Sequence, residues 1–146
     1  MKKILSKSLE DTAMIASEWL GSLSKKEGEA LVAGLSGDLG SGKTAFTKAV
    51  AAALGITEIV TSPTYVIEKI YSGGPTSGWA RLIHIDAYRL ESERELQVLD
   101  FEVLVNDPNN LILIEWPENV EEIMPKGALA IKCEHVSETE REYTFE

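Results

Sequence analysis

A chain of 146 residues is long enough to bury a hydrophobic core, and we expect one domain spanning residues 1–146. Its 44% apolar and 26% charged residues exclude a fibrous or disordered protein. With a net charge of −10 we do not expect strong binding of RNA by the chain alone, because such binding normally needs a basic patch. Charged residues interrupt the N-terminal apolar run before a signal peptide could form, and no run is long enough to span a membrane. We therefore expect a cytoplasmic protein without a membrane partner.

The first expected element is an amphipathic helix that begins after Ser8 and ends near Gly21. Ser8 and the acidic Asp11 form an N-cap signature. Apolar residues that recur at steps of four and three would face inward, namely Leu9, Ala13, Ala16, Leu20 and Leu23.

Residues 30–35 form a short apolar run that predicts a buried strand. A glycine-rich segment follows, and residues 43–54 predict a second helix that ends at Gly55. Its inward residues would be Phe46, Ala49, Val50 and Ala53. The local order is therefore strand, glycine loop, helix.

Residues 65–71 and 79–85 predict an antiparallel hairpin, because the segment between them has the composition of a loop. Residues 91–105 predict a helix broken near Asp100, and 111–114 predict a strand covered on both faces. Two further strands are expected at 128–133 and 141–145, the first ending at the single cysteine, Cys133, which we expect in the core. These elements predict an α/β sandwich with a mainly parallel central sheet, antiparallel additions, and helices on both faces.

The segment SGDLGSGKT, residues 36–44, matches the phosphate-loop pattern of glycine, four residues, glycine, lysine and serine or threonine. Backbone N–H groups of such a loop wrap around phosphate oxygens, and the next helix points its positive end at them. The expected fold is thus of the P-loop NTPase type. Lys43 would reach the β and γ phosphates, and the Thr44 hydroxyl would ligate Mg²⁺. Together, the loop residues expected to contact a nucleotide are Asp38, Leu39, Gly40, Ser41, Gly42, Lys43 and Thr44.

Two acids stand at the ends of predicted strands: Asp86 after residues 82–85, and Glu115 after residues 111–114. Strands beside a phosphate loop bring their last side chains to the edge of the sheet where ligands bind. We expect at least one of the two to contact Mg²⁺, directly or through water, and the other to position an attacking water. The pattern leaves open which carboxylate contacts the metal.

The sequence also bears on the nucleotide and the reaction. No run of asparagine or threonine, lysine, any residue and aspartate is present, which disfavours GTP. A kinase for a small metabolite would need an acceptor pocket and a lid, for which the chain leaves little room. That kinase, or an adaptor regulated by a nucleotide, remains the alternative to an ATPase.

Four motifs occur together in a specific order: GDLGSGKT at 37–44, SPTY at 62–65, HIDAYRL at 84–90 and EWP at 115–117. In their order and spacing the chain resembles, over nearly its whole length, the bacterial TsaE (also YjeE) family of ATPases. The resemblance implies a protein that binds and hydrolyses ATP with Mg²⁺ and works with TsaD and TsaB. That complex forms threonylcarbamoyladenosine beside the anticodon of tRNAs reading codons that begin with adenine, so the chain would meet tRNA only indirectly.

The resemblance also assigns roles to matching residues. It implies that Lys43, Asp86 and Glu115 are catalytic, with Asp86 orienting water, and that Thr44 and Glu115 hold the metal. Thr64 would lie in a switch-like segment near the γ-phosphate, Trp116 near the nucleotide, and Asp11 and Thr12 in part of the adenine pocket. Hydrolysis should be slow until the partners complete the site.

Three further positions lie within or near these motifs. His84 could be structural or catalytic, and Arg89 could counter phosphate charge or pair with an acid. Many relatives have glycine where this chain has Asp100, and aspartate tolerates the left-handed backbone that such a position needs.

Overall fold

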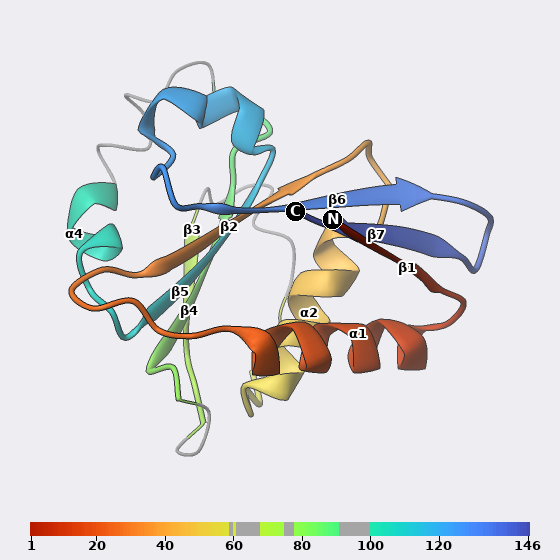
Figure 1. The fold of residues 1–146 in the computed structure, drawn as a ribbon, viewed down its shortest axis with the longest axis horizontal. Helices are drawn as coiled ribbons and strands as arrows, with labels where there is room; N and C mark the ends of the chain where they lie inside the picture. Colours follow the sequence, from red (N-terminus) through yellow and green to blue (C-terminus); the bar gives the residue numbers. More distant parts are fainter. Residues whose placement is uncertain (59, 61–67, 75–77, 91–99) are drawn as a thin grey trace.

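The computed structural model describes residues 1–58, 60, 68–74, 78–90 and 100–146 (Figure 1). The strands within these residues are β1 (Lys2–Ser6), β2 (Leu31–Ser36), β3 (Glu68–Ser72), β4 (Arg81–Asp86), β5 (Asn110–Glu115), β6 (Leu129–His135) and β7 (Arg141–Phe145). They form one sheet in the order β1-β7-β6-β2-β5-β4-β3. The central strand β2 pairs in parallel with β5 and β6, and β4 pairs in parallel with β5. The outer pairs β3/β4, β6/β7 and β1/β7 are antiparallel, which confirms the predicted sheet.

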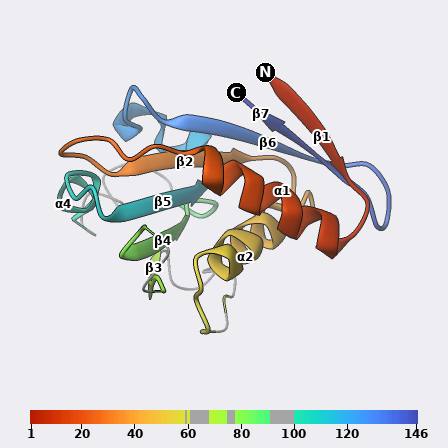
Figure 2. The same cartoon turned by 60° about the horizontal axis from the view of Figure 1, so that its bottom comes forward.

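Helices cover both faces of this sheet, as predicted. Helix α1 (Leu9–Ser22) and helix α2 (Lys43–Ala53) pack on one face, as Figures 1 and 2 show. The short helix α4 (Phe101–Val105) and the 3₁₀ segment η1 (Pro117–Ile123) lie against the other. No helix of the described residues has both the length and the apolar character needed to cross a membrane.

Strand β5 contributes side chains to both of the apolar layers that cover the two faces of the sheet. Leu111 and Leu113 pack with α1 and α2, whereas Ile112 and Ile114 pack with α4 and η1. All six residues of the strand are buried, which confirms a strand covered on both faces. The alternation continues to Glu115, whose side chain therefore lies on the α2 side of the sheet.

The inward face of α1 is confirmed in part, since Ala16 is buried and Leu20 and Leu23 are partly buried against the core. Leu9 is 75% exposed and Ala13 is also exposed, whereas Thr12, Ile15 and Trp19 are buried. The expected inward positions of Leu9 and Ala13 are therefore wrong, and the buried polar residue Thr12 was not among the inward positions predicted. Its hydroxyl is satisfied inside, since Oγ1 lies 2.7 Å from Oγ of Ser6.

Helix α2 follows the prediction more closely. Phe46 and Val50 are fully buried, Ala49 is partly buried, and Ala53 is exposed, so the expected inward position of Ala53 is wrong. Gly55 follows the helix at φ 76°, a left-handed conformation that glycine adopts without strain.

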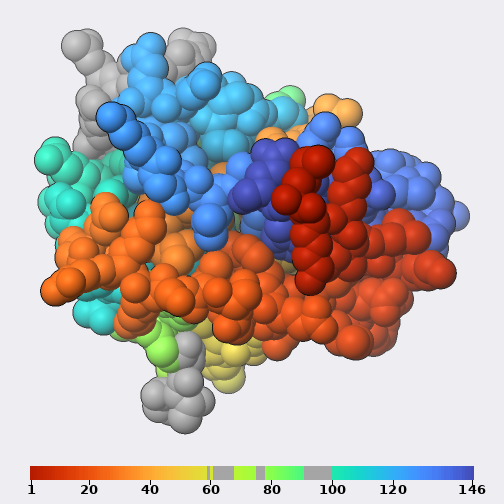
Figure 3. Space-filling model, viewed as in Figure 1, coloured from red at the N-terminus to blue at the C-terminus, as the bar shows by residue number. Residues whose placement is uncertain are grey.

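Strand β1 was not predicted. It pairs with β7 so that Lys2 lies opposite Phe145 and Ser6 opposite Arg141. Figure 3 shows it on the surface beside the C-terminal strand. Exposed residues dominate this edge strand, so its sequence carries little of the apolar pattern that identified the buried strands.

The predicted hairpin and the helix expected at residues 91–105 lie only partly within the described residues. The β3/β4 hairpin is confirmed, although residues 65–67 and 75–77 lie outside the described part of the chain, as do residues 91–99 of the expected helix. Asp100 adopts φ 57° and ψ 39°, which confirms the break before α4. Cys133 is buried as expected, and desolvation raises the pKa of its thiol to about 12.

Candidate nucleotide site

The glycine loop joins the end of β2 at Ser36 to the start of α2 at Lys43. Gly37 and Gly42 have φ of 144° and 105°, values that residues with a side chain rarely adopt. A Cβ at Gly37 would overlap the carbonyl oxygen of Cys133 in β6. The loop therefore requires glycine for backbone conformation and for close approach to the sheet.

Lys43 is 5% exposed, and its ammonium group lies over the loop. Nζ donates hydrogen bonds to the carbonyl oxygens of Gly37 at 2.5 Å and Asp38 at 2.9 Å. It also lies 4.3 Å from the centroid of the Trp116 ring, a cation–π distance. These are neutral acceptors, so a phosphate oxygen would be a stronger partner for the same ammonium.

Glu115 brings the end of β5 to the start of α2. Each of its carboxylate oxygens lies 3.4 Å from Oγ1 of Thr44. The carboxylate is 4% exposed, and Nε2 of His84 lies 2.5 Å from its Oε2. His84 therefore fixes the carboxylate that faces the Thr44 hydroxyl, which is a structural role, and a catalytic role for His84 stays a prediction.

Asp86 lies directly opposite Glu115 in the β4/β5 pairing, so the two carboxylates share one face of the sheet. Oδ1 of Asp86 accepts the backbone N–H of Tyr88 at 2.9 Å. Partial burial raises the pKa of Asp86, and the charge of Glu115 adds to the rise, while the Tyr88 N–H, His84 and Lys43 oppose it. The net effect is a pKa above the ordinary value, which disfavours the charged form in the absence of a cation.

The donors gathered here suit a hard cation. Mg²⁺ prefers oxygen ligands and is usually held by one or two carboxylates together with substrate phosphates. The Thr44 hydroxyl and the Glu115 carboxylate converge at the loop, and Asp86 lies beside them on the next strand. The residues present therefore fit a Mg²⁺ ion bound together with a polyphosphate.

Two cavities meet at the loop. The first, of about 330 Å³, is lined by residues 39–45 with Asp86, Tyr88, Glu115 and Trp116, and we call it the phosphate cavity. The second, of about 360 Å³, adjoins it at Gly42 and Ala45, and we call it the base cavity. Its other lining residues are Ser6, Lys7, Ser8, Leu9, Thr12, Glu138, Thr139, Arg141 and Tyr143.

Most of the sequence-predicted residues line one of these cavities, whereas Asp38 lines neither and instead lines a cavity beside β6. Trp116 lines the phosphate cavity with φ 61°, and its ring centroid lies 5.0 Å from that of Tyr88. Thr12 lines the base cavity, whereas Oδ2 of Asp11 accepts the backbone N–H of Lys7 at 2.9 Å, so an adenine contact from Asp11 stays a prediction. Thr64 lies outside the described residues.

Several lining residues were missed by sequence reasoning. Ser6 ends the unpredicted strand β1 and Lys7 follows it, and Arg141 and Tyr143 belong to β7. None belongs to a motif, and their place at the loop comes from pairing between the two ends of the chain. The buried position of Tyr143 inside a predicted strand was the one signal available.

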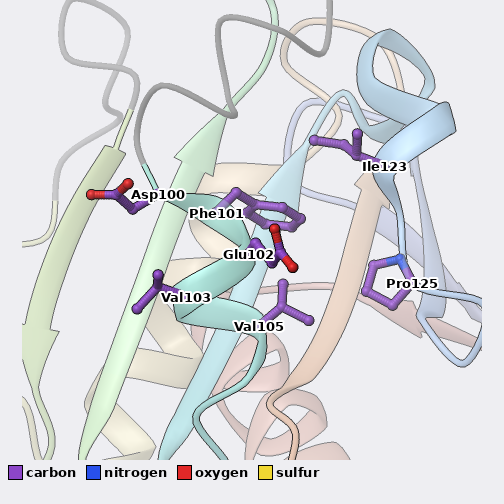
Figure 4. A pocket seen from close by; sticks show the side chains of 7 residues that line it. All are labelled: Asp100, Phe101, Glu102, Val103, Val105, Ile123 and Pro125. Carbon is purple, nitrogen blue, oxygen red and sulfur yellow. The ribbon is translucent and has the colours of Figure 1, made fainter.

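A larger cavity, about 650 Å³, lies elsewhere, between α4 and η1 (Figure 4). Phe101 and Val105 line it from α4, with Ile123 and Pro125 across from them. Its charged lining residues, Asp100 and Glu102, are acidic. A cavity with this lining does not suit a phosphate, so the smaller pair at the glycine loop is the candidate nucleotide site.

Comparison with known proteins identifies the family of the chain. Residues 6–143 match the family model of the threonylcarbamoyl adenosine biosynthesis protein TsaE. The chain is 41% identical over 136 residues to the tRNA threonylcarbamoyladenosine biosynthesis protein TsaE of Bacillus subtilis, covering 93% of this chain and 79% of that protein. It is 32% identical to the protein of the same name from Treponema pallidum, covering 97% and 98%.

A solved structure shares the fold. The crystal structure of Bacillus subtilis YdiB superposes with a TM-score of 0.74 at 33% identity, covering 99% of this chain and 83% of that one. The match of the family model over nearly the whole chain, together with relatives of this identity, establishes that the chain belongs to the TsaE family of threonylcarbamoyladenosine biosynthesis proteins.

Proposed function

We propose that this chain is a Mg²⁺-dependent ATPase that serves TsaD and TsaB in forming threonylcarbamoyladenosine on tRNA in the cytoplasm. The observation that carries the proposal is the convergence of Lys43, Thr44, Asp86 and Glu115 around one cavity at the glycine loop. The names of the relatives support the pathway. The net charge of −10 supports contact with tRNA through the complex only.

The loop and Lys43 would bind the triphosphate. Backbone N–H groups at the start of α2 would donate to phosphate oxygens, and the helix dipole would favour the negative charge. Lys43 would exchange the carbonyl oxygens of Gly37 and Asp38 for oxygens of the β and γ phosphates. The adenosine would extend into the base cavity past Gly42.

Thr44 and Glu115 would hold the Mg²⁺ ion, which would neutralise charge on the β and γ phosphates. His84 keeps the Glu115 carboxylate in place for that task. Asp86 would orient a water for attack on the γ phosphorus, and its raised pKa makes it a better proton acceptor than an ordinary aspartate. Free phosphate and ADP would be the products.

Turnover by the chain alone should be slow. Of the described residues that line the phosphate cavity, Lys43 alone is cationic. Phosphoryl transfer is usually accelerated by a further cation that stabilises the transition state. Docking of TsaD and TsaB would have to complete the site.

The nucleotide site is tested with Lys43→Ala. Titration calorimetry with ATP and Mg²⁺ should show loss of most of the affinity, because the ammonium contact to two phosphates is removed. Unchanged affinity would show that the site is misassigned.

The pathway role is tested by reconstituting tRNA modification with TsaD and TsaB, with and without this chain, over many turnovers. Omission should reduce the yield, and an unchanged yield would refute the role. Product analysis separates the alternatives: free phosphate supports an ATPase, a phosphorylated metabolite supports a kinase, and neither supports an adaptor.

A further inference from the structure

Strand β7 reaches the glycine loop through two side chains. The hydroxyl of Tyr143 donates to the carbonyl oxygen of Gly42 at 3.2 Å, and Nε of Arg141 donates to that of Gly40 at 3.1 Å. In each pair the two residues are 101 positions apart in the sequence. The loop is therefore held from the far end of the chain as well as by its own strand and helix.

Arg141 is itself fixed by the turn that precedes it. Its Nη1 donates to the carbonyl oxygens of Ser137 at 2.6 Å and Glu140 at 2.9 Å. Three carbonyl oxygens thus surround one guanidinium, whose planar fork can serve all of them at once. A lysine ammonium has no such fork, so the contact is specific for arginine.

Tyr143 is fully buried, and its ring lies 5.3 Å from that of Phe46 in α2. Burial raises the pKa of its hydroxyl to about 12, so the hydroxyl keeps its proton and remains a donor at physiological pH. A Cβ at Gly42 would lie only 2.7 Å from this hydroxyl oxygen. The absence of a side chain at Gly42 thus permits the contact.

The contact sets the direction of one peptide group. The Gly42 carbonyl accepts the N–H of Phe46 at 2.9 Å as well as the Tyr143 hydroxyl. In a planar trans peptide this carbonyl and the N–H of Lys43 point in opposite directions. Fixing the carbonyl therefore fixes the Lys43 N–H, one of the groups at the start of a helix that have no partner within it and can bind an anion.

We propose, on the basis of the nucleotide-binding function proposed above, that Arg141 and Tyr143 are positioning residues of the phosphate loop. They hold the carbonyls of Gly40 and Gly42 so that the loop is preset for a polyphosphate before it binds. The two residues extend the site from the local motif at 37–44 to the C-terminal strand.

Tyr143→Phe tests the hydroxyl, because it removes one oxygen and keeps the ring. The matched control is Tyr71→Phe: Tyr71 is also buried, and its hydroxyl has no hydrogen-bond partner within the described part of the chain. The Kd for ATP and for inorganic tripolyphosphate is measured by calorimetry at a temperature where every variant is folded. Tyr143→Phe should weaken both ligands by about three- to tenfold, and Tyr71→Phe should leave both unchanged.

Arg141→Lys tests the guanidinium, because it keeps the charge and loses the fork. Its control is Arg81→Lys, since Arg81 bonds Asp107 and Asn110 and belongs to neither cavity. Tripolyphosphate affinity should fall about three- to tenfold in Arg141→Lys and stay unchanged in Arg81→Lys. Full affinity in the lysine variant would overturn the assignment of Arg141.

The same titrations separate this proposal from the function on which it rests. A wild-type chain that binds neither ATP nor tripolyphosphate would refute both. Wild-type binding with unchanged affinity in Tyr143→Phe and Arg141→Lys would overturn the positioning role alone. A lowered melting temperature with unchanged affinity would assign the two residues to stability and overturn it as well.

Discussion

Nε2 of His84 and Oε2 of Glu115 lie 2.5 Å apart beneath the glycine loop, and neither side chain is exposed by more than 4%. The two residues come from neighbouring parallel strands, β4 and β5. A buried carboxylate needs such a donor, and here the donor also fixes the oxygens that face Thr44.

His84→Leu should lower the free energy of unfolding by about 1–3 kcal/mol, because the buried carboxylate of Glu115 loses its partner. His84→Gln should cost less, since its amide nitrogen can donate from a similar position. Urea unfolding of the ligand-free protein measures both. A leucine variant as stable as the wild type would show that the hydrogen bond contributes nothing net.

Asp86→Asn should stabilise the ligand-free protein. The same change should remove most of the ATP hydrolysis. Burial raises the pKa of Asp86, so its charge is disfavoured in the folded state, and asparagine keeps the acceptor for the Tyr88 N–H. The melting temperature in EDTA should rise, while phosphate release should fall by about a hundredfold or more. A variant that melts lower, or that hydrolyses ATP normally, would contradict the prediction.

Gly37→Ala should destabilise the protein by about 1–3 kcal/mol, because its φ is left-handed and its Cβ would meet the Cys133 carbonyl. Gly21→Ala is the control, since a Cβ there has no heavy atom within 4 Å among the neighbours described and Gly21 lies in helix α1. That change should stabilise by about 0.5–1 kcal/mol. Thermal unfolding measures both, and effects of equal sign would contradict the argument.

Asp107 contacts Arg81 at the start of β4, the end of the strand opposite Asp86. Its carboxylate should make the free energy of unfolding depend on pH. The backbone N–H of Asn109 lowers the pKa of Asp107 most; desolvation opposes this, and Arg81 lowers the pKa further. A carboxylate whose pKa is lower in the folded state than in the unfolded state stabilises the fold at pH values above its unfolded-state pKa. This stabilisation is lost as the pH falls through the lower, folded-state pKa. The stability difference between wild type and Asp107→Asn should therefore be larger at about pH 6 than at about pH 3. Urea unfolding at both values tests this, and a difference that grows on acidification would refute it.

The local parts of this molecule were predictable from sequence, and the long-range parts were not. The glycine loop between β2 and α2 is identified by a motif of a few neighbouring residues. Strand β5 is likewise identified by a short run of apolar residues. The place of Tyr143 at Gly42 depends on pairing between strands from opposite ends of the chain, for which no local pattern exists. The face of α1 was predicted only in part, because an apolar pattern does not identify Thr12, a polar residue that is buried with its own partner.

The position of Trp116 over the Lys43 ammonium gives the molecule an internal optical reporter. The other two tryptophans, Trp19 and Trp79, are 9% and 6% exposed and line neither the phosphate cavity nor the base cavity. An anion bound at the loop would draw the Lys43 ammonium away from the Trp116 indole. The electric field would then change at Trp116 and not at the other two tryptophans. Emission from a chain in which Trp19 and Trp79 are replaced by Phe would therefore follow occupancy of the loop in real time, without any attached dye.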